Sequence, residues 1–186
     1  MKEGSNKGFT LIELIITIVV LTVLVSISMP LFDVFDQRRL VAAGEAIYSN
    51  LQFARSEAIK QSRHIFVRVS SNGGRDWCLG VSENAHCDCT VTDPTTAKAC
   101  VLSFDGSDNL LLKTLHSADF NGVIMDPADF DFPFDGVRGM LVGVNNNTIK
   151  LQSEKGRQLN VIVSRMGRVR ICSPNGDVRG YPACQR

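Results

Sequence analysis

The chain has 186 residues, 44% of them apolar, which is enough for one domain of ordinary size with its own hydrophobic core. Its formal net charge of +1 excludes an overall electrostatic bias toward nucleic acid or acidic membranes, so charge has to be judged region by region. Residues 157–186 hold six Arg and one Asp, whereas residues 103–135 hold seven Asp and one Lys.

The N-terminus consists of a short polar leader, residues 1–8, followed by an apolar segment over 9–32. This segment contains a single charge, Glu13, and has the roughly 20 residues that a helix needs to span a bilayer. A secretory signal would be cleaved after its apolar run at small residues, but no such site follows Ser28. The small residue is Gly8, before the run, so cleavage there would leave the helix on the mature protein.

Glu13 is a carboxylate inside an apolar segment, a costly position that usually has a partner. The amino group that cleavage would create on Phe9 is the nearest candidate. Such a pair, within one chain or between neighbours, would neutralise both charges and set the axial register of a subunit in a helical bundle. The alternative is that Glu13 snorkels to the membrane interface.

Helical periodicity continues over residues 33–63, which we predict to be an amphipathic continuation of the same helix. Apolar residues recur there at three- and four-residue steps. They are Leu40, Ala43, Ile47, Leu51, Ala54 and Ala58.

From residue 64 onward the pattern shortens to strand-like runs separated by Gly, Asn, Asp and Pro. The runs cover residues 64–70, 76–81, 100–104, 110–115, 122–125, 139–144, 148–152, 158–163 and 168–172. The Asp-rich stretch 126–136 lacks the spacing of an EF-hand loop and is predicted to be a solvated turn. The sequence therefore predicts an α+β fold in which a β-rich head, residues 64–186, packs an antiparallel sheet on the helix.

The six cysteines favour disulfides, because the N-terminus is of an export type and disulfides form outside the cytosol. A bridge between Cys172 and Cys184 would close a loop of about 13 residues, for which the loop-entropy model gives roughly 3 kcal/mol. Three pairings are open to the other four, which are Cys78, Cys87, Cys89 and Cys100. The segment 82–100 is too polar for the core and is predicted to be an excursion held by bridges.

Metal binding and catalysis are not expected. A metal site at His86, Cys87 and Cys89 would lack the C-x2-C spacing of zinc sites. The three histidines are scattered and have no Ser or Cys partner pattern of a catalytic triad. We predict neither a cofactor nor an enzymatic activity.

The residues Gly8, Phe9, Thr10, Leu11, Ile12 and Glu13 match the prepilin family one for one. This resemblance implies that prepilin peptidase cuts between Gly8 and Phe9 and methylates the new amino group of Phe9. It also implies a type IV pilin-like fold, a single-pass inner-membrane protein with a periplasmic head, and later assembly with major and minor pilins through the N-terminal helix. The assembled form would be an extracellular pilus or a periplasmic pseudopilus.

Two further segments resemble the GspH/FimT branch of that family, which contains minor pilins and secretion pseudopilins. They are LQFARSEAIK at 51–60 and GRVRIC at 167–172. The resemblance covers the N-terminal third of the chain and about the last twenty residues. Between them only the general pattern is similar.

The C-terminal arginines are candidates for binding double-stranded DNA. On a strand, alternation would put Arg168 and Arg170 on one face, where Arg165 and Arg179 could join them. Guanidiniums grip phosphate oxygens by paired hydrogen bonds. FimT-type minor pilins of naturally transformable bacteria bind DNA through a C-terminal Gly-Arg-x-Arg motif, and residues 167–170 match it.

Other interpretations of this tail remain open. The arginines could pair with the acidic stretch 103–135 or protect a sheet edge. The subunit could then prime or cap pilus assembly, with roles in twitching motility or adhesion, or serve as a type II secretion pseudopilin. Trp77 and Tyr181 are possible stacking platforms for bases, although a single Trp is more often part of a core.

Overall fold

The computed structural model describes residues 9–103 and 110–184, without the side chains of residues 27–32. The chain divides into two compact units, Met1–Phe35 and Asp36–Arg186. One long helix, α1 (Leu11–Gln61), contributes to both units. The second unit contains all the described strands and is the head of the molecule.

In the first unit, Thr10 caps the start of α1. The hydroxyl and carbonyl oxygens of Thr10 both accept the backbone N–H of Glu13, at 3.3 and 3.1 Å. A threonine at this position satisfies one of the free N–H groups of a helix start, and an acidic residue in the first turn is favoured by the helix dipole. The apolar side chains from Leu11 to Val25 are mostly exposed. In the part of the chain that the structure describes, no helix is both long and apolar enough to cross a membrane.

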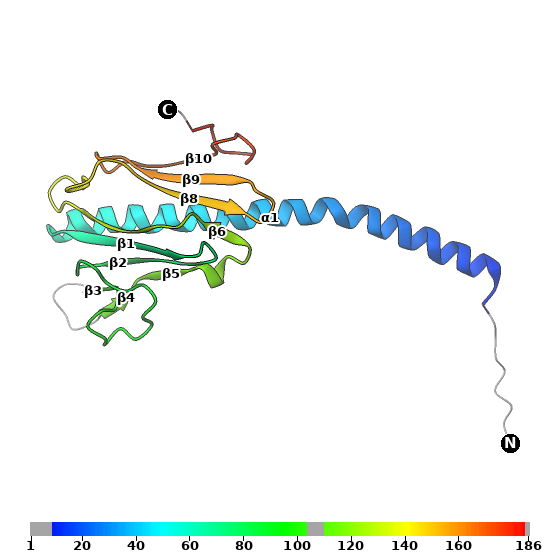
Figure 1. Cartoon of the computed structure of the whole chain (residues 1–186), viewed down its shortest axis with the longest axis horizontal. Coiled ribbons are helices and arrows are strands. Elements are labelled where there is room, and N and C mark those ends of the chain that lie inside the picture. Colours follow the sequence, from blue (N-terminus) through cyan, green and yellow to red (C-terminus); the bar gives the residue numbers. More distant parts are fainter. Residues whose placement is uncertain (1–8, 104–109, 185–186) are drawn as a thin grey trace, which may run out of the picture. The chain divides into compact units, whose positions relative to one another are not determined.

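The strands of the head form two four-stranded antiparallel sheets and a small hairpin. The first sheet has the order β5 (Thr114–His116), β2 (Asp76–Ser82), β1 (Ile65–Asn72) and β7 (Asp129–Phe134). The second has the order β10 (Val169–Cys172), β9 (Gln158–Val163), β8 (Asn147–Ser153) and β6 (Val123–Met125). The hairpin pairs β3 (Val101–Ser103) with β4 (Leu110–Leu112), and a short 3-10 helix, η1 (Ser117–Asp119), follows β5. Figure 1 shows both larger sheets beside the C-terminal half of α1.

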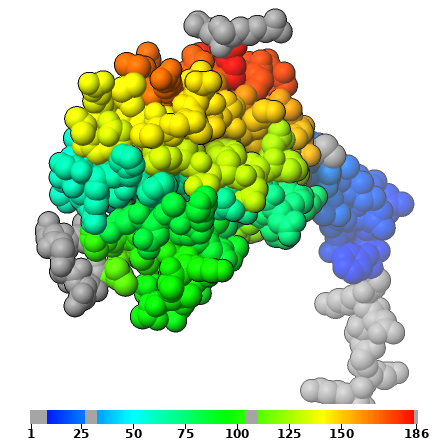
Figure 2. All heavy atoms as spheres, turned by 60° about the vertical axis from the view of Figure 1, so that its left-hand side comes forward, coloured from blue at the N-terminus to red at the C-terminus, as the bar shows by residue number. Residues whose placement is uncertain are grey.

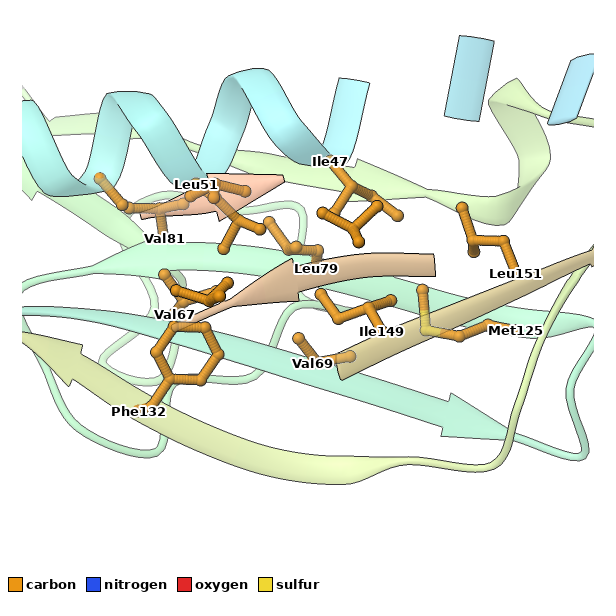
Figure 3. Packing of buried hydrophobic residues seen from close by; sticks show 14 of the residues in the cluster. Ile47, Leu51, Val67, Val69, Leu79, Val81, Met125, Phe132, Ile149 and Leu151 are labelled. Carbon is orange, nitrogen blue, oxygen red and sulfur yellow. The ribbon is translucent and has the colours of Figure 1, made fainter. Parts of the chain in front are cut away.

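The core lies between α1 and the inner faces of the two sheets. The predicted apolar stripe of α1, residues 40 to 58, is fully buried. Figure 3 shows Ile47 and Leu51 of α1 facing side chains of the strands, among them Leu79 of β2 and Ile149 of β8. At Gly44 an added Cβ would lie 2.5 Å from the Leu159 side chain, so glycine lets β9 approach the helix closely. The predicted α+β fold is confirmed.

Two strand predictions were wrong. The stretch 126–136, predicted as a solvated turn, contains β7, where Phe132 and Phe134 alternate into the core and are fully buried. Pro133 is compatible with β7 because this strand lies at the edge of its sheet, where a missing N–H removes no ladder bond. The run 139–144, predicted as a strand, is irregular apart from one bridge at Leu141. In this run Gly139 and Gly143 have positive φ angles, which break an extended conformation.

The structure determines the pairing of the four clustered cysteines, which the sequence left open. Cys78 bridges Cys89, and Cys87 bridges Cys100, so the two bridges interleave along the chain. All four cysteines are buried at the base of the excursion between β2 and β3. Figure 2 shows this part of the chain, in green, gathered on one region of the surface. The predicted C-terminal bridge, Cys172 to Cys184, is confirmed.

Candidate nucleic-acid interface

The hairpin that joins β9 to β10 carries the Gly-Arg-x-Arg motif. The N–H of Gly167 donates to the carbonyl of Ser164 at 2.8 Å, and the N–H of Ser164 donates to the carbonyl of Arg168 at 2.9 Å. Gly167 closes the turn with a φ of +75°, in the left-handed region that favours glycine. The motif therefore begins at the residue that turns the chain into β10.

Gly167 also packs directly on another segment of backbone. A Cβ placed on Gly167 would lie 1.9 Å from the carbonyl oxygen of Gly139. That oxygen accepts a hydrogen bond of 3.1 Å from Nε of Arg55 on α1. Sequence reasoning treated this glycine only as part of a binding motif, but the fold itself requires it. The sequence feature that indicates this structural role is the position of Gly167 between two strand-like runs.

Arg168 and Arg170 are exposed on either side of the buried Val169. In the ladder, Val169 pairs with Val163 and Arg170 pairs with Ile162, so Val169 faces the core and Arg170 faces outward. β10 is the edge strand of its sheet and has β9 as its neighbour. The alternation therefore places both guanidiniums on the outer side of an exposed edge, as the sequence predicts.

Arg165 and Arg179 extend this basic strip at its two ends. The backbone of Arg165 is held by Asn146, whose side-chain oxygen accepts its N–H at 3.0 Å, and by the N–H of Leu141 at 2.9 Å. The carbonyl of Arg179 accepts a long hydrogen bond of 3.5 Å from the amide of Gln37 on α1. Both arginine side chains are exposed.

The length of the strip can be estimated from α1. The hairpin meets α1 at Arg55, and the Arg179 loop meets it at Gln37. These two helix positions are about 27 Å apart, at a rise of roughly 1.5 Å per residue.

The disulfide loop that carries Arg179 is seated on α1 rather than free. Its Val178 is buried, and its Tyr181 hydroxyl donates to the carboxylate of Glu45. Partial burial and the hydrogen bond to Glu45 raise the pKa of Tyr181 to about 12. Tyr181 is thus used to hold the loop. Trp77 is also structural, because it is buried and its Nε1–H donates to the Val123 carbonyl at 3.0 Å.

The four guanidiniums of the strip form no ion pair with any carboxylate in residues 9–103 and 110–184. The acidic stretch has other cations nearby. Asp129 and Asp131 pair with Arg68 of β1, and Asp126 lies 3.2 Å from the Lys150 ammonium. Within the described chain, the acidic stretch thus leaves the C-terminal arginines available.

The remaining candidates fall outside this strip. Cys87 and Cys89 are in disulfides, so they are not available as metal ligands beside His86. Gly8 lies outside the described residues. Phe9 is exposed, and Glu13 lies in the first turn of α1, as its backbone bonds to Thr10 show. Cleavage at Gly8 and a pairing role for Glu13 stay predictions.

Comparison with known proteins adds two family matches and two solved structures. The family described as type II transport protein GspH matches residues 43–167, and the prokaryotic N-terminal methylation motif matches residues 4–29. The type IV minor pilin FimU of Pseudomonas aeruginosa is similar in two crystal forms. One is 20% identical, with a TM-score of 0.45, over 71% of this chain and 91% of that chain. The other is 19% identical, with a TM-score of 0.46, over 72% and 88%.

The GspH match covers well over half of the chain and includes the last part of α1 and all the described strands except β10, which follows residue 167. This head and the methylation motif together define the class of the protein, which is a pilin-like subunit. The chain belongs to the GspH family. It is a minor pilin or pseudopilin of a type IV pilus or type II secretion system, assembles with other pilins and is processed by prepilin peptidase.

Proposed function

We propose that this subunit is incorporated in a type IV pilus and binds double-stranded DNA through Arg165, Arg168, Arg170 and Arg179 during natural transformation. The observation that carries this proposal is the exposure of Arg168 and Arg170 on one side of β10, without an ion pair among the described residues. A guanidinium presents planar, paired donors that fit phosphate oxygens.

The rigid setting of the strip supports the proposal. The hairpin backbone is held at Gly167 and Arg165, and the Arg179 loop is closed by a disulfide and held on α1. Little ordering of these backbones is required on binding, and this reduces the entropic cost of association. Contacts confined to phosphates position the duplex without reading its sequence, as uptake of unrelated DNA requires.

The N-terminal part has a separate role in this proposal. Residues 1–8 are a leader removed between Gly8 and Phe9, and residues 9–32 hold the subunit in the inner membrane before assembly and in the filament afterwards. Glu13 would pair with the methylated amino group of Phe9. The exposed apolar side chains from Leu11 to Val25 support this role, because they need a lipid or protein environment. Sequencing the mature N-terminus tests it, and a first residue other than Phe9 would reject it.

DNA binding is tested with the full chain in detergent and a fluorescent duplex, over a series of salt concentrations. Four phosphate contacts predict that log K falls with log salt at a slope of about −3.6. The double variant Arg168→Gln with Arg170→Gln should lose half of this slope and bind at least tenfold more weakly at low salt. Arg75→Gln is the matched control, because Arg75 is an exposed arginine in the turn between β1 and β2, outside the strip.

Two results would contradict the proposal. One is the absence of binding at low salt. The other is an equal loss of affinity in the single variant Arg168→Gln and in Arg75→Gln, which would assign binding to net charge rather than to the strip.

A role in assembly is separated from DNA binding in cells. Cells that lack the gene are compared with cells that carry the double variant, by the number of surface pili and by the frequency of transformation. DNA binding predicts that the double variant keeps normal pili and loses transformation. Loss of pili in the double variant would instead show that the C-terminal tail is needed for filament assembly.

A further inference from the structure

A second surface of the head lies apart from the outer side of β10. It is a hollow of about 440 Å³ lined by Arg165 and by seven residues of the loop before β8, which are Asp135, Val137, Arg138, Met140, Leu141, Val142 and Gly143. Gly139, which lies between the lining residues Arg138 and Met140 in the chain, is next to Ile59 and Arg55 in the last turns of α1. The hollow is therefore at the end of the head where α1 ends. We call Val137, Arg138, Val142, Arg165 and Met166 the Arg138 surface.

The Arg138 surface exposes large apolar side chains. Val137 is 79% exposed, Met166 is 65% exposed and Val142 is 39% exposed. Met166 lies between Arg165, which lines the hollow, and Gly167, which packs on Gly139. Single exposed apolar residues are ordinary, but a group of them around a hollow marks an interaction site. Methionine and arginine are also enriched at protein interfaces.

Neither Arg138 nor Arg165 forms an ion pair within the described residues. Asp135, the acidic residue of the hollow, is already engaged. Its carboxylate accepts the N–H groups of Val137 and Arg138 at 3.2 and 3.0 Å and lies 4.0 Å from Nε2 of His64.

We propose that the Arg138 surface binds a protein segment of another subunit that presents a carboxylate beside apolar side chains. The carboxylate would lie between Arg138 and Arg165, and the apolar side chains would cover Val137, Val142 and Met166. Exposed valine and methionine side chains add nothing to the binding of phosphates, whereas they are the part of a protein interface that excludes water. Arg165 belongs both to this surface and to the basic strip, whereas Arg168 and Arg170 belong to the strip alone. Substitution of Arg168 and Arg170 therefore tests DNA binding without changing this surface.

The test uses the full chain in its native host, with a photoreactive phenylalanine analogue in place of Val137. The same analogue in place of the exposed Ala97, on the excursion between β2 and β3, is the control. We expect a cross-link to another protein at position 137 that exceeds the control at least tenfold. The cross-linked peptide, identified by mass spectrometry, should contain Asp or Glu next to apolar residues.

Charge reversal then tests the pairing. Arg138→Glu in the position-137 protein should reduce the cross-link at least tenfold, because a like charge then faces the partner's carboxylate. Exchanging that carboxylate for arginine in the partner should restore it. Arg138→Glu should leave thermal unfolding close to that of the parent, which separates this surface from folding. The double variant Arg168→Gln with Arg170→Gln should leave the cross-link at position 137 unchanged, which separates this surface from DNA binding.

Four outcomes would overturn the proposal: a cross-link to DNA, one to lipid, one to a second copy of this chain, or no excess over position 97. A protein cross-link that survives Arg138→Glu would also overturn it.

Discussion

Gly167 and Gly139 touch through their backbones, and this contact seats the β9–β10 hairpin on the loop before β8. No side chain fits between them, since the Gly139 oxygen occupies the space of a Cβ on Gly167. The Gly-Arg-x-Arg motif therefore contains two kinds of residue. Its glycine serves the fold, and the guanidiniums of its arginines form no ion pair with the residues that the structure describes. The two kinds can be separated by mutation.

The replacement Gly167→Ala should destabilise the head by about 3 kcal/mol. The left-handed conformation costs an alanine roughly 1–2 kcal/mol, and relief of the clash with Gly139 requires backbone movement. Thermal unfolding measures the effect. Gly176→Ala is the control, because Gly176 also has a positive φ, of +65°, but has open space around it. Equal losses in both variants would show that the Gly139 contact does not matter.

The double variant Arg168→Gln with Arg170→Gln should leave stability within about 0.5 kcal/mol of the parent, because both side chains are exposed. Urea unfolding at fixed pH measures this. A larger loss would mean that the guanidiniums hold the fold together, and a weaker DNA affinity would then not be evidence for a binding site.

Removal of the C-terminal bridge, by Cys172→Ser with Cys184→Ser, should cost about 3 kcal/mol by the loop-entropy model. For a chain of this size the expected fall in melting temperature is roughly 6 to 12 °C. Trypsin should then cut after Arg179 much faster, since the loop is no longer closed around it. Unchanged cleavage would mean that Val178 and Tyr181 hold the loop without the bridge.

The contact between Tyr181 and Glu45 should be lost at high pH. The folded-state pKa of Tyr181, about 12, lies above the ordinary 10.0, so the fold favours the neutral phenol. The contact therefore contributes fully below about pH 10 and is lost as the pH rises through about 12. Tyrosinate absorbance checks this, with Tyr181→Phe subtracted to remove the signal of Tyr48. A difference curve centred at the ordinary value would contradict the contact.

In the core, Phe132→Ala should destabilise the head by about 3–5 kcal/mol, because this side chain, on the residue of β7 that pairs with Val67 of β1, is fully buried. Phe130→Ala, two residues earlier on the same face of the strand, should cost less because its side chain is only partly buried. Urea unfolding compares the two. Equal costs would argue against the deeper burial of Phe132.

The helix was predictable in detail because its apolar stripe has a clear period. The six positions from Leu40 to Ala58 are all fully buried, as their spacing indicates. Most strands were predictable for the same reason. The exceptions were β7, whose three acidic or proline positions hide the alternation of its phenylalanines, and the run 139–144, whose glycines need left-handed backbone.

The candidate interface was only partly predictable. The sequence indicates that Arg168 and Arg170 share a face, because strand alternation is local. It does not indicate that Arg165 is held by Asn146, or that Tyr181 reaches Glu45, since both contacts join segments far apart in the chain. The pairing of the four clustered cysteines was undetermined for the same reason.

The interleaved bridges at the base of the excursion have a practical use. Cys78, Cys87, Cys89 and Cys100 fasten both ends of this segment to β2 and β3, while Thr95, Thr96 and Ala97 at its far turn are exposed. A fluorophore or a short epitope inserted in that turn should not disturb the core, because two disulfides hold the base of the segment in place. The excursion is thus a place to tag the subunit for imaging without touching the arginine strip or the Arg138 surface.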